Sequence, residues 1–333
     1  MIKVAMLSFW HVHAGDYARQ AEEHPETEIV AVWDEIPERG IAEAKKRNVK
    51  FYDNLEELLA QKDIVGVIVD TPTNLHHDVI VKSANAGKHI FTEKVVATTL
   101  KEFNDCLAAV EKAGVKLTVS LPRLNHGSTL AIQDIIAKGL LGELTLVRVR
   151  LSHNGALAGW LPEHFFNLEQ CGGGALMDLG CHPMYLTRLF LGMPESVSAN
   201  YGYICGKEVE DNAVSILKYP SGALGIVEAG FVNSFSPFCI EVHGTDGTLL
   251  YGFPKEELLL RTNKLGEAAA NEWIVQTLPQ DKPSAFHQWV DHINTNTTAN
   301  DNIHLAADLT KLMEASNLSA QQNKPVRIAI LAH

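Results

Sequence analysis

Two residues suited to proton transfer, Asp178 and His182, lie four positions apart near the middle of the chain. In a helix this spacing places both side chains on one face. A carboxylate beside an imidazole favours the imidazolium and orients the ring, as a general acid or base requires. The glycines at 172–174 would let backbone approach a ligand and leave helix amides free. An incidental pair at a helix N-terminus explains the spacing equally well, and Pro183 predicts a kink or a helix that begins near His182.

The elements that must position this pair begin with a regular alternation of strands and helices over the first third of the chain. The β-branched run Ile64–Asp70 is typical of a buried central strand. The alternation predicts a doubly wound parallel sheet, which binds ligands at the carboxyl ends of its strands. The expected strands are 3–7, 28–33, 50–52, 64–70, 89–92 and 116–120, and the expected helices are 14–23, 37–47, 55–60, 76–86 and 99–113.

The pattern changes after Ser120. Turn signals at 219–222 and 243–247 join segments with alternating or β-rich patterns, which predicts a mainly antiparallel sheet. We therefore expect two domains, 1–120 and 121–333, with a boundary near Ser120–Arg123. The expected later elements are helices 127–138, 285–295 and 303–322 and strands 144–152, 196–203, 213–219, 223–231, 238–243, 248–251 and 325–330.

Composition narrows the class of protein. The net charge is −12, from 40 acidic and 28 basic residues, which argues against a nucleic-acid or anionic-membrane partner. The five cysteines are scattered without a CxxC pair, so we expect reduced thiols in a cytoplasmic protein. The N-terminal segment is typical of a strand rather than a signal peptide, and no apolar run reaches membrane-spanning length.

The first two strand ends bear on nucleotide binding. Asp34 ends the second strand about twenty residues past the first turn, where a carboxylate accepts hydrogen bonds from an adenosine ribose. Such a carboxylate repels a 2′-phosphate, so we expect NAD rather than NADP, although Asp34 also suits a helix cap. The loop Ser8–Gly15 lacks the G-x-G-x-x-G pattern. Amides at the helix start, with Ser8 and His11 as donors, are the expected phosphate site.

Several spaced motifs resemble those of the Gfo/Idh/MocA oxidoreductase family. The segments Thr71–His76, Ala86–His89 and Glu93-Lys94 follow the family's order of T-P-N-x-x-H, A-G-K-H and E-K-P. The segment Gly172–His182 resembles its G-G-G-x-x-x-D-x-G-x-H motif. Weaker similarities extend the resemblance over almost the whole chain, at Arg123, Glu210–Asn212, Gly244–Gly247 and Asn323–Val326.

This resemblance implies an N-terminal Rossmann domain and a C-terminal α/β domain whose open, mainly antiparallel sheet forms a homodimer or homotetramer. It implies hydride transfer between NAD, or less favourably NADP, and a secondary hydroxyl of a sugar, cyclitol or related polyol. Loss of a hydride from a carbinol requires loss of the hydroxyl proton, so a base must reach it and a cation stabilises the alkoxide. By the resemblance, His182 is that acid/base, Lys94 lies beside nicotinamide and hydroxyl, and Asp178 binds substrate and orients the site.

The remaining site residues follow from the resemblance and from their places in loops. His76 at a helix start also suits a capping or packing group, and the aromatic and imidazole groups also suit packing under a long loop. The expected cofactor contacts are Ser8, Phe9, Trp10, His11, His13, Asp34, Thr71, Pro72, Asn74, His76, Glu93 and Lys94. The expected substrate contacts are Arg123, His153, Trp160, His164, Asp178 and Tyr185.

The chain departs from the family pattern at three places. The first loop lacks the family's glycines and is about three residues shorter. Val95 stands where the E-K-P motif has proline, and Tyr185 stands where many members have a second aspartate. These departures bear on cofactor geometry and substrate class more than on fold.

Two other interpretations remain open, and a metal site is a third that we considered. One is a lyase, epimerase or glycosidase that uses tightly bound NAD for transient oxidation. Another is a nucleotide- or sugar-binding sensor without turnover, which the missing glycines would suit. We expect no metal site, because scattered histidines are a poor indication of coordination; the residues considered for one are His11, His13, His153, His164, His182 and Asp178.

Overall fold

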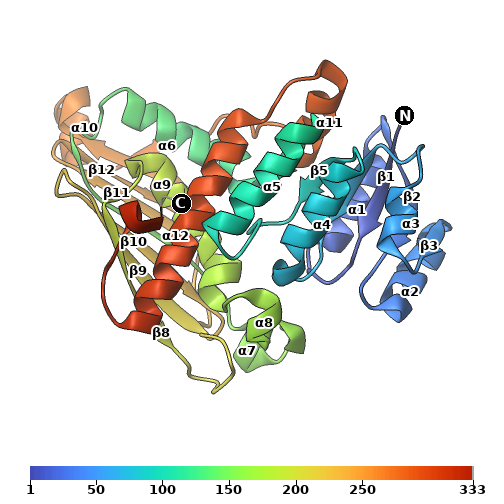
Figure 1. Ribbon diagram of the computed structural model, residues 1–333. Helices are drawn as coiled ribbons and strands as arrows, with labels where there is room; N and C mark the ends of the chain where they lie inside the picture. The colour runs from blue at the N-terminus through green and yellow to red at the C-terminus, as the bar shows by residue number, and fades with distance from the viewer. Residues whose placement is uncertain (332–333) are drawn as a thin grey trace. The chain divides into compact units, whose positions relative to one another are not determined.

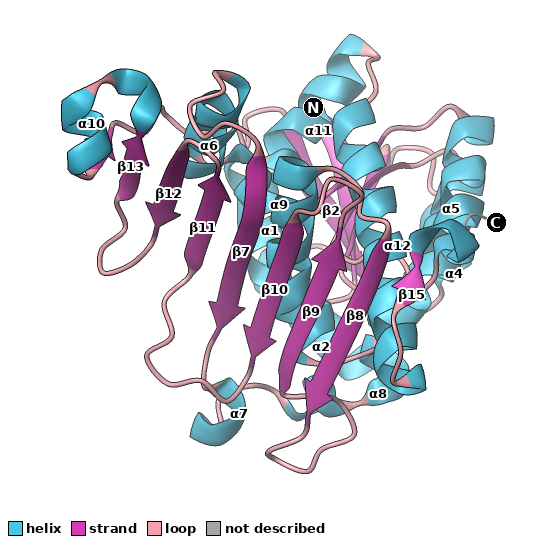
Figure 2. Cartoon of the chain, turned by 90° about the vertical axis from the view of Figure 1, so that its left-hand side faces the viewer, coloured by secondary structure: helices cyan, strands magenta, loops and turns pink. Residues whose placement is uncertain are grey.

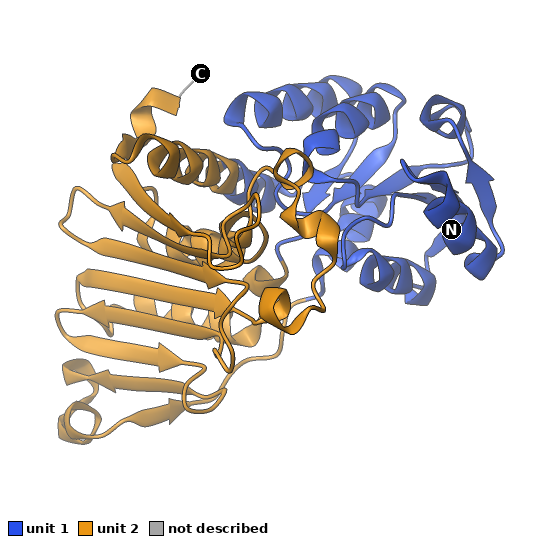
Figure 3. Ribbon diagram, turned by 90° about the horizontal axis from the view of Figure 1, so that it is seen from below, with its two compact units in different colours: residues 1–121, 283–307 blue, residues 122–282, 308–333 orange. Residues whose placement is uncertain are grey.

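The computed structural model describes residues 1–331, with helices and strands labelled as in Figure 1. The chain divides into two compact units, coloured separately in Figure 3. Unit 1 comprises Met1–Leu121 and Pro283–Ala307, and unit 2 comprises Pro122–Lys282 and the chain from Asp308 onward. The segment Pro283–Ala307, which the sequence analysis assigned to the second domain, thus belongs to unit 1. Residues 332–333 of the predicted second domain lie outside the described residues.

Unit 1 contains a six-stranded parallel sheet of order β3-β2-β1-β4-β5-β6, which confirms the predicted doubly wound fold. Its last paired residues are in register: Leu7 pairs with both Trp33 and Val69, and Val69 also pairs with Thr92. The residues that follow these strands therefore share one edge of the sheet. The strands are β1 (Ile2–Leu7), β2 (Thr27–Trp33), β3 (Lys50–Tyr52), β4 (Gly66–Val69), β5 (His89–Thr92) and β6 (Leu117–Val119).

Helices α1, α2 and α11 have the predicted bounds, whereas α4 begins at Thr73, three residues before the predicted start. Pro37 lies in the first turn of its helix, and Thr99 forms a capping box with Glu102. Buried Phe286 and Trp289 from the returning segment pack in one core with residues of β1, β4, β5 and α1, which explains why that segment belongs here. These helices are α1 (Ala14–Glu23), α2 (Pro37–Arg47), α3 (Leu55–Leu59), α4 (Thr73–Asn85), α5 (Leu100–Ala113) and α11 (Ala285–Thr295).

Unit 2 contains a nine-stranded sheet of order β14-β13-β12-β11-β7-β10-β9-β8-β15. Neighbouring strands are antiparallel except β7 and β10, so the prediction of a mainly antiparallel sheet is confirmed. The sequence analysis missed β13 and β14. The strands are β7 (Leu144–Ser152), β8 (Ser196–Gly202), β9 (Asn212–Lys218), β10 (Leu224–Gly230), β11 (Cys239–Gly244), β12 (Gly247–Tyr251), β13 (Leu258–Thr262), β14 (Ile274–Gln276) and β15 (Val326–Arg327).

Burial alternates along the central strands of unit 2, as expected for a sheet with one covered face. Figure 2 shows the broad sheet with its helices behind it. Among residues 1–331, none of the helices combines the length and the apolar character needed to cross a membrane. The helices are α6 (Gly127–Ala137), α7 (Gly155–Ala158), α8 (Leu168–Cys171), α9 (Cys181–Leu191), α10 (Glu267–Asn271) and α12 (Asn300–Gln322). Helix α12 begins in unit 1 and continues into unit 2 after Ala307. The shorter turns are η1 (Pro122–Asn125), η2 (Glu163–Phe166), η3 (Leu176–Gly180), η4 (Asn263–Leu265) and η5 (Ile328–Leu331).

Candidate active site

The loop after β1 keeps a glycine-like turn without a glycine. Ser8 has φ 78°, in the left-handed region that favours glycine. Its buried hydroxyl accepts hydrogen bonds from the Trp10 amide at 3.1 Å and from the Arg39 guanidinium at 3.2 Å. The hydroxyl therefore stabilises the loop from inside, and its expected role as a phosphate donor stays a prediction.

The aromatic residues of this loop also pack inward. Trp10 is buried, and Phe9 packs against the core of unit 1 with the Arg47 guanidinium 4.7 Å from its ring centre. The Phe9 amide donates to Asp34 at 2.9 Å. Most of each side chain packs against the protein. Cofactor contacts through Phe9 and Trp10 stay a prediction.

Asp34 follows β2, as predicted, but its carboxylate has an ion-pair partner. Arg39 donates to Asp34 from Nε at 2.9 Å and from Nη2 at 2.7 Å, and the Ile36 amide donates at 2.8 Å. The Asp34 side chain is fully buried, and Glu35 also binds Arg39. A guanidinium that neutralises Asp34 weakens its repulsion of a 2′-phosphate, on which the preference for NAD rested. The sequence analysis missed Arg39.

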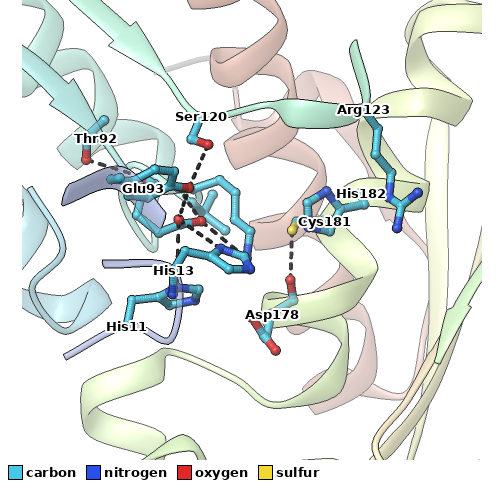
Figure 4. A network of polar contacts seen from close by, with 12 residues as sticks. His11, His13, Thr92, Glu93, Ser120, Arg123, Asp178, Cys181 and His182 are labelled. Atoms are coloured by element: carbon cyan, nitrogen blue, oxygen red, sulfur yellow. Dashed lines mark hydrogen bonds and ion pairs between the residues drawn. The ribbon is translucent and has the colours of Figure 1, made fainter. Parts of the chain in front are cut away.

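Glu93 lies at the end of β5 in the polar network of Figure 4. Its Oε1 accepts the Lys94 amide at 3.0 Å and lies 3.3 Å from the Lys94 Nζ. Its Oε2 faces His13 Nδ1 at 3.2 Å, His11 Nδ1 at 3.7 Å and the Tyr17 hydroxyl. Burial opposes ionisation of Glu93, but the charges of Lys94, His11 and His13 outweigh it and hold the pKa well below its ordinary value. The predicted residues His11, His13, Glu93 and Lys94 thus form one cluster.

A second carboxylate lies close to this cluster. Asp70 follows β4 and is fully buried, and burial together with the charge of Glu93 raises its pKa well above the ordinary value. Within the described residues, neither carboxylate oxygen of Asp70 has a hydrogen-bond partner. Burial, Glu93 and Asp70 likewise raise the pKa of Tyr17, whose hydroxyl lies 2.6 Å from the Ser120 hydroxyl. Asp70 and Tyr17 were not among the expected site residues, because the strand order places Asp70 at this edge and the packing of α1 places Tyr17 there.

The Thr71–His76 motif joins β4 to the start of α4. Thr71 and Pro72 are buried, whereas Asn74 is exposed in the first turn of α4. His76 is buried, with Nδ1 2.8 Å from the Val95 carbonyl oxygen and Nε2 3.0 Å from that of Thr71, and burial lowers its pKa. These bonds connect two strand ends, so His76 positions Val95, and its expected contact with the cofactor stays a prediction. The Lys94–Val95 peptide bond is cis.

In unit 2, the segment of Asp178 and His182 is a widened helical turn. Leu176–Gly180 is a π-helical turn that continues into α9, with Pro183 in the first turn of the α-helix. The chain thus accommodates Pro183 by a change of helix type before it. The expected one-face arrangement of a regular α-helix does not form, and in Figure 4 the Asp178 carboxylate points away from the His182 imidazole.

Tyr185 orients the His182 ring. Its buried hydroxyl lies 3.1 Å from His182 Nδ1 and accepts the Arg123 amide at 3.0 Å. A tyrosine can donate to a neutral imidazole and accept from an imidazolium, whereas a carboxylate favours the imidazolium alone. Tyr185 is therefore one group that orients the ring, and the expected role of Asp178 stays a prediction. The charge of Asp178 also acts on His153.

Glu210 anchors the start of this helical segment, and the sequence analysis gave it no role beyond a weak family similarity. Its Oε2 accepts the Gly174 amide at 2.8 Å and its Oε1 accepts the Leu176 amide at 2.9 Å. Its carbonyl oxygen accepts the intervening Ala175 amide at 2.8 Å. Burial raises the pKa of Glu210 to about 7 against the lowering effect of these amides. One residue from the loop before β9 thus binds three amides at the helix start.

Three of the remaining predicted substrate residues lie on or near the loop after β7. His153 stacks on Phe231 with ring centres 5.2 Å apart, and exposed Trp160 lies 4.5 Å from His153. Burial lowers the pKa of His153 although Asp178 opposes that shift. His164 is half-buried beside Phe165, and Arg123 packs its guanidinium 3.8 Å from the Phe238 ring centre. Their contacts with substrate stay predictions.

A doubly wound unit with charged residues at its strand ends, and a second α/β unit with an oriented histidine, define a class of nucleotide-dependent enzymes. A family model described as an oxidoreductase family with an NAD-binding Rossmann fold matches residues 10–121, and a Gfo/Idh/MocA C-terminal domain model matches residues 129–250. The chain belongs to the Gfo/Idh/MocA oxidoreductase family, which confirms the resemblance.

Characterised relatives act on several sugars and cyclitols. The 1,5-anhydro-D-fructose reductase of Ensifer adhaerens is 31% identical over 231 residues, which cover 67% of this chain and 68% of that protein. Inositol 2-dehydrogenase of Rhizobium meliloti (strain 1021) is 29% identical over 242 residues, 70% of each chain. A levoglucosan dehydrogenase in complex with NADH and levoglucosan aligns with a TM-score of 0.83 over 98% of this chain and 99% of that one. At 18% identity this last likeness shows the fold alone.

Proposed function

We propose that the protein is a dehydrogenase that transfers a hydride between a nicotinamide nucleotide and a secondary hydroxyl of a sugar, cyclitol or related polyol. The observation that carries the proposal is His182, whose Nδ1 is held by the Tyr185 hydroxyl at 3.1 Å. A histidine oriented through one ring nitrogen can exchange a proton at the other. The reductase and dehydrogenase names of the relatives support the substrate class.

The residues of unit 1 fit a nicotinamide nucleotide. The strand ends of β1, β2, β4 and β5 lie in register, and Ser8 adopts the backbone that a glycine would otherwise supply. The Asp34–Arg39 pair offers both a carboxylate for ribose hydroxyls and a guanidinium for a phosphate, so NAD and NADP are both compatible. When bound, the nicotinamide supplies the hydride acceptor or donor.

The protein's own residues would stabilise the developing charge and transfer the proton. Lys94 has its ammonium 3.3 Å from Glu93 and its side chain is 1% exposed, so its position is well defined. We assign it to stabilising negative charge on the substrate oxygen. His182 takes the hydroxyl proton on Nε2 while its Nδ1–H donates to Tyr185. Because the phenol serves either charge state of the ring, the proton can also return in the reverse direction.

The substrate class follows from chemistry as well as relatives. His153 and Trp160 present an imidazole and an indole beside each other, and Asp178 lies close enough for its charge to act on His153. Aromatic faces pack on the apolar face of sugar rings, and carboxylates accept hydroxyl hydrogen bonds. A neutral polyhydroxylated ring suits this set better than an anionic substrate does, because the nearby carboxylate repels anions.

A homo-oligomer formed through the sheet of unit 2 is part of the proposal. Its open face carries the Arg148–Glu228 and Arg148–Glu241 ion pairs at 2.9 and 3.6 Å, and the side chains of these residues are partly exposed. Light scattering during size-exclusion chromatography should give the mass of a dimer or tetramer of the 36.6 kDa chain. A monomer at micromolar concentration would contradict this part alone. A cytoplasmic location likewise stays a prediction.

The test of the function is a panel of sugars and inositols assayed for reduction of NAD and NADP. His182→Ala should lower turnover by about 10²–10⁴-fold while nucleotide binding, measured by fluorescence, stays close to wild type. His243→Ala is the matched control, because that histidine lies on β11 and hydrogen-bonds Thr248. Unchanged turnover in His182→Ala, or no response to either nucleotide, would refute the proposal. Turnover without net reduction of nucleotide would indicate transient oxidation instead.

A further inference from the structure

The cluster at the end of β5 contains three side chains of the kind that ligate metals. His11 and His13 come from the loop after β1, and Glu93 joins them from 80 residues beyond His13. One potential ligand atom from each residue lies within 4.8 Å of the other two. Figure 4 shows the His11 and His13 imidazoles next to the Glu93 carboxylate. All three residues belong to unit 1.

The separations match those of ligands around a small transition-metal ion. Metal–ligand distances of about 2.0–2.2 Å in a tetrahedral site separate neighbouring ligand atoms by roughly 3.3–3.6 Å. The observed separations from Glu93 Oε2 are 3.2 Å to His13 Nδ1 and 3.7 Å to His11 Nδ1. An ion could therefore enter with small side-chain movements. Its entry would exchange the bond that His11 Nδ1 accepts from the His13 amide at 3.2 Å for a metal bond.

The surroundings orient Glu93 toward the imidazoles. The Lys94 amide and ammonium engage Oε1, which leaves Oε2 toward His11 and His13. The Tyr17 hydroxyl contacts the same Oε2. Hydrogen bonds of this kind hold metal-binding carboxylates in place. The His13 side chain is 36% exposed, whereas those of His11 and Glu93 are 6% and 1% exposed, so His13 provides the entry side.

Asp70 provides a second, independent observation. This carboxyl group is fully buried, and within residues 1–331 neither of its side-chain oxygens has a hydrogen-bond partner. The Asp70 carbonyl oxygen accepts the His11 amide at 3.3 Å, so the residue lies beside the cluster. A buried polar group without a partner is costly, and a cation with its bound water beside Glu93 would lower that cost.

We propose that His11, His13 and Glu93 bind a divalent transition-metal ion of the Zn²⁺, Co²⁺ or Fe²⁺ class. Two imidazoles and one carboxylate suit these ions, whereas Ca²⁺ and Mg²⁺ require mainly oxygen ligands. Three protein ligands leave coordination positions for water or for an oxygen of a small anion. The inference goes beyond the proposed function, because hydride transfer to a nicotinamide needs no metal.

The experiment titrates the full-length protein, stripped with EDTA and dialysed, with Zn²⁺ in a calorimeter. We expect one ion per chain. His13→Ala should weaken binding at least about 100-fold, because removing even an outer-shell partner typically costs 10–100-fold. His77→Ala is the matched control, because His77 lies 2.9 Å from Asp78 and 3.8 Å from Asp105 elsewhere in unit 1. The titration uses no nucleotide and measures no turnover. A failure to bind Zn²⁺ is therefore distinct from a failure of the proposed function.

A second variant distinguishes loss of a metal ligand from loss of the fold. His13→Cys should retain Zn²⁺ binding and give Co²⁺-loaded protein a thiolate-to-metal charge-transfer band, which a structural role of His13 would not produce. Equal Zn²⁺ affinity in wild type and His13→Ala would overturn the proposal. So would inorganic phosphate binding to metal-free protein that depends on His13 while Zn²⁺ does not bind, because the cluster would then be an anion site.

Discussion

Glu210→Gln should change how the stability of this protein depends on pH. The Glu210 carboxylate is buried at the helix start before α9, and burial raises its pKa from 4.5 to about 7. A carboxyl whose pKa is higher in the folded state contributes stability that is fully present below pH 4.5 and is lost as pH rises to about 7. The glutamine variant has no proton to lose at this position.

The size of the effect follows from the shift. A rise of the Glu210 pKa from 4.5 to about 7 on folding corresponds to about 3 kcal/mol. Between pH 5 and pH 8 the free energy of unfolding of the wild type should therefore fall by about 2.5 kcal/mol relative to Glu210→Gln, mostly below pH 7. The variant also replaces one acceptor of the Gly174 and Leu176 amides by a donor, which adds a pH-independent cost of about 1–3 kcal/mol.

Urea unfolding followed by far-UV circular dichroism at pH steps from 5 to 8 measures this difference. Glu208→Gln is the control, because this exposed neighbour accepts only a 3.3 Å bond from Leu168 among the bonds described, and its curve should parallel the wild type. A wild-type minus Glu210→Gln difference that stays constant across this range would refute the reasoning. A difference that rises with pH would mean that the helix-start amides, rather than burial, control the carboxyl.

Four further substitutions test packing, cofactor choice and ring orientation. A Cβ on Gly174 would lie 2.0 Å from a backbone oxygen, so Gly174→Ala should lower the free energy of unfolding by about 3 kcal/mol. A Cβ on Gly15 in α1 would have open space around it, so Gly15→Ala should raise the free energy of unfolding by about 0.5–1 kcal/mol. Thermal or urea unfolding measures both effects. Arg39→Ala leaves the neighbouring carboxylate unpaired, so the Kd of NADP should rise about tenfold relative to that of NAD, and equal changes for both nucleotides would count against this role. Tyr185→Phe removes the bond to His182, so kcat/KM should fall about tenfold and its pH profile should move, while a change in KM alone would point to a packing role.

Local sequence determined much of the fold. Helices α1, α2 and α11 and strands β3, β5 and β7 have the bounds that periodicity and caps predict. Proline at a helix start, glycine after a helix and β-branched runs act over a few residues, so they can be read directly. The parallel order of the first sheet followed from the same alternation, because parallel strands need crossover helices.

The segment 283–307 was harder to assign. Nothing within it distinguishes a helix of the second domain from one that packs with unit 1. Its membership depends on Phe286 and Trp289, which are fully buried with the residues of β1, β4 and β5. Such packing joins residues almost the whole chain apart, and apolar periodicity identifies the buried face of a helix without identifying what covers it.

In the candidate site, too, local sequence indicated some residues and tertiary packing decided their contacts. The sequence alone indicated Lys94, Asp178 and His182, because side-chain chemistry and family-like spacing are local properties. Only the tertiary structure decided which further groups act there: Tyr185 contacts His182 Nδ1, and Glu210 binds the amides at the helix start. It also decided that Arg39 pairs with Asp34 and that Glu93 meets His11 and His13. These contacts depend on strand register, on a π-helical turn and on burial, which arise only when distant segments pack together.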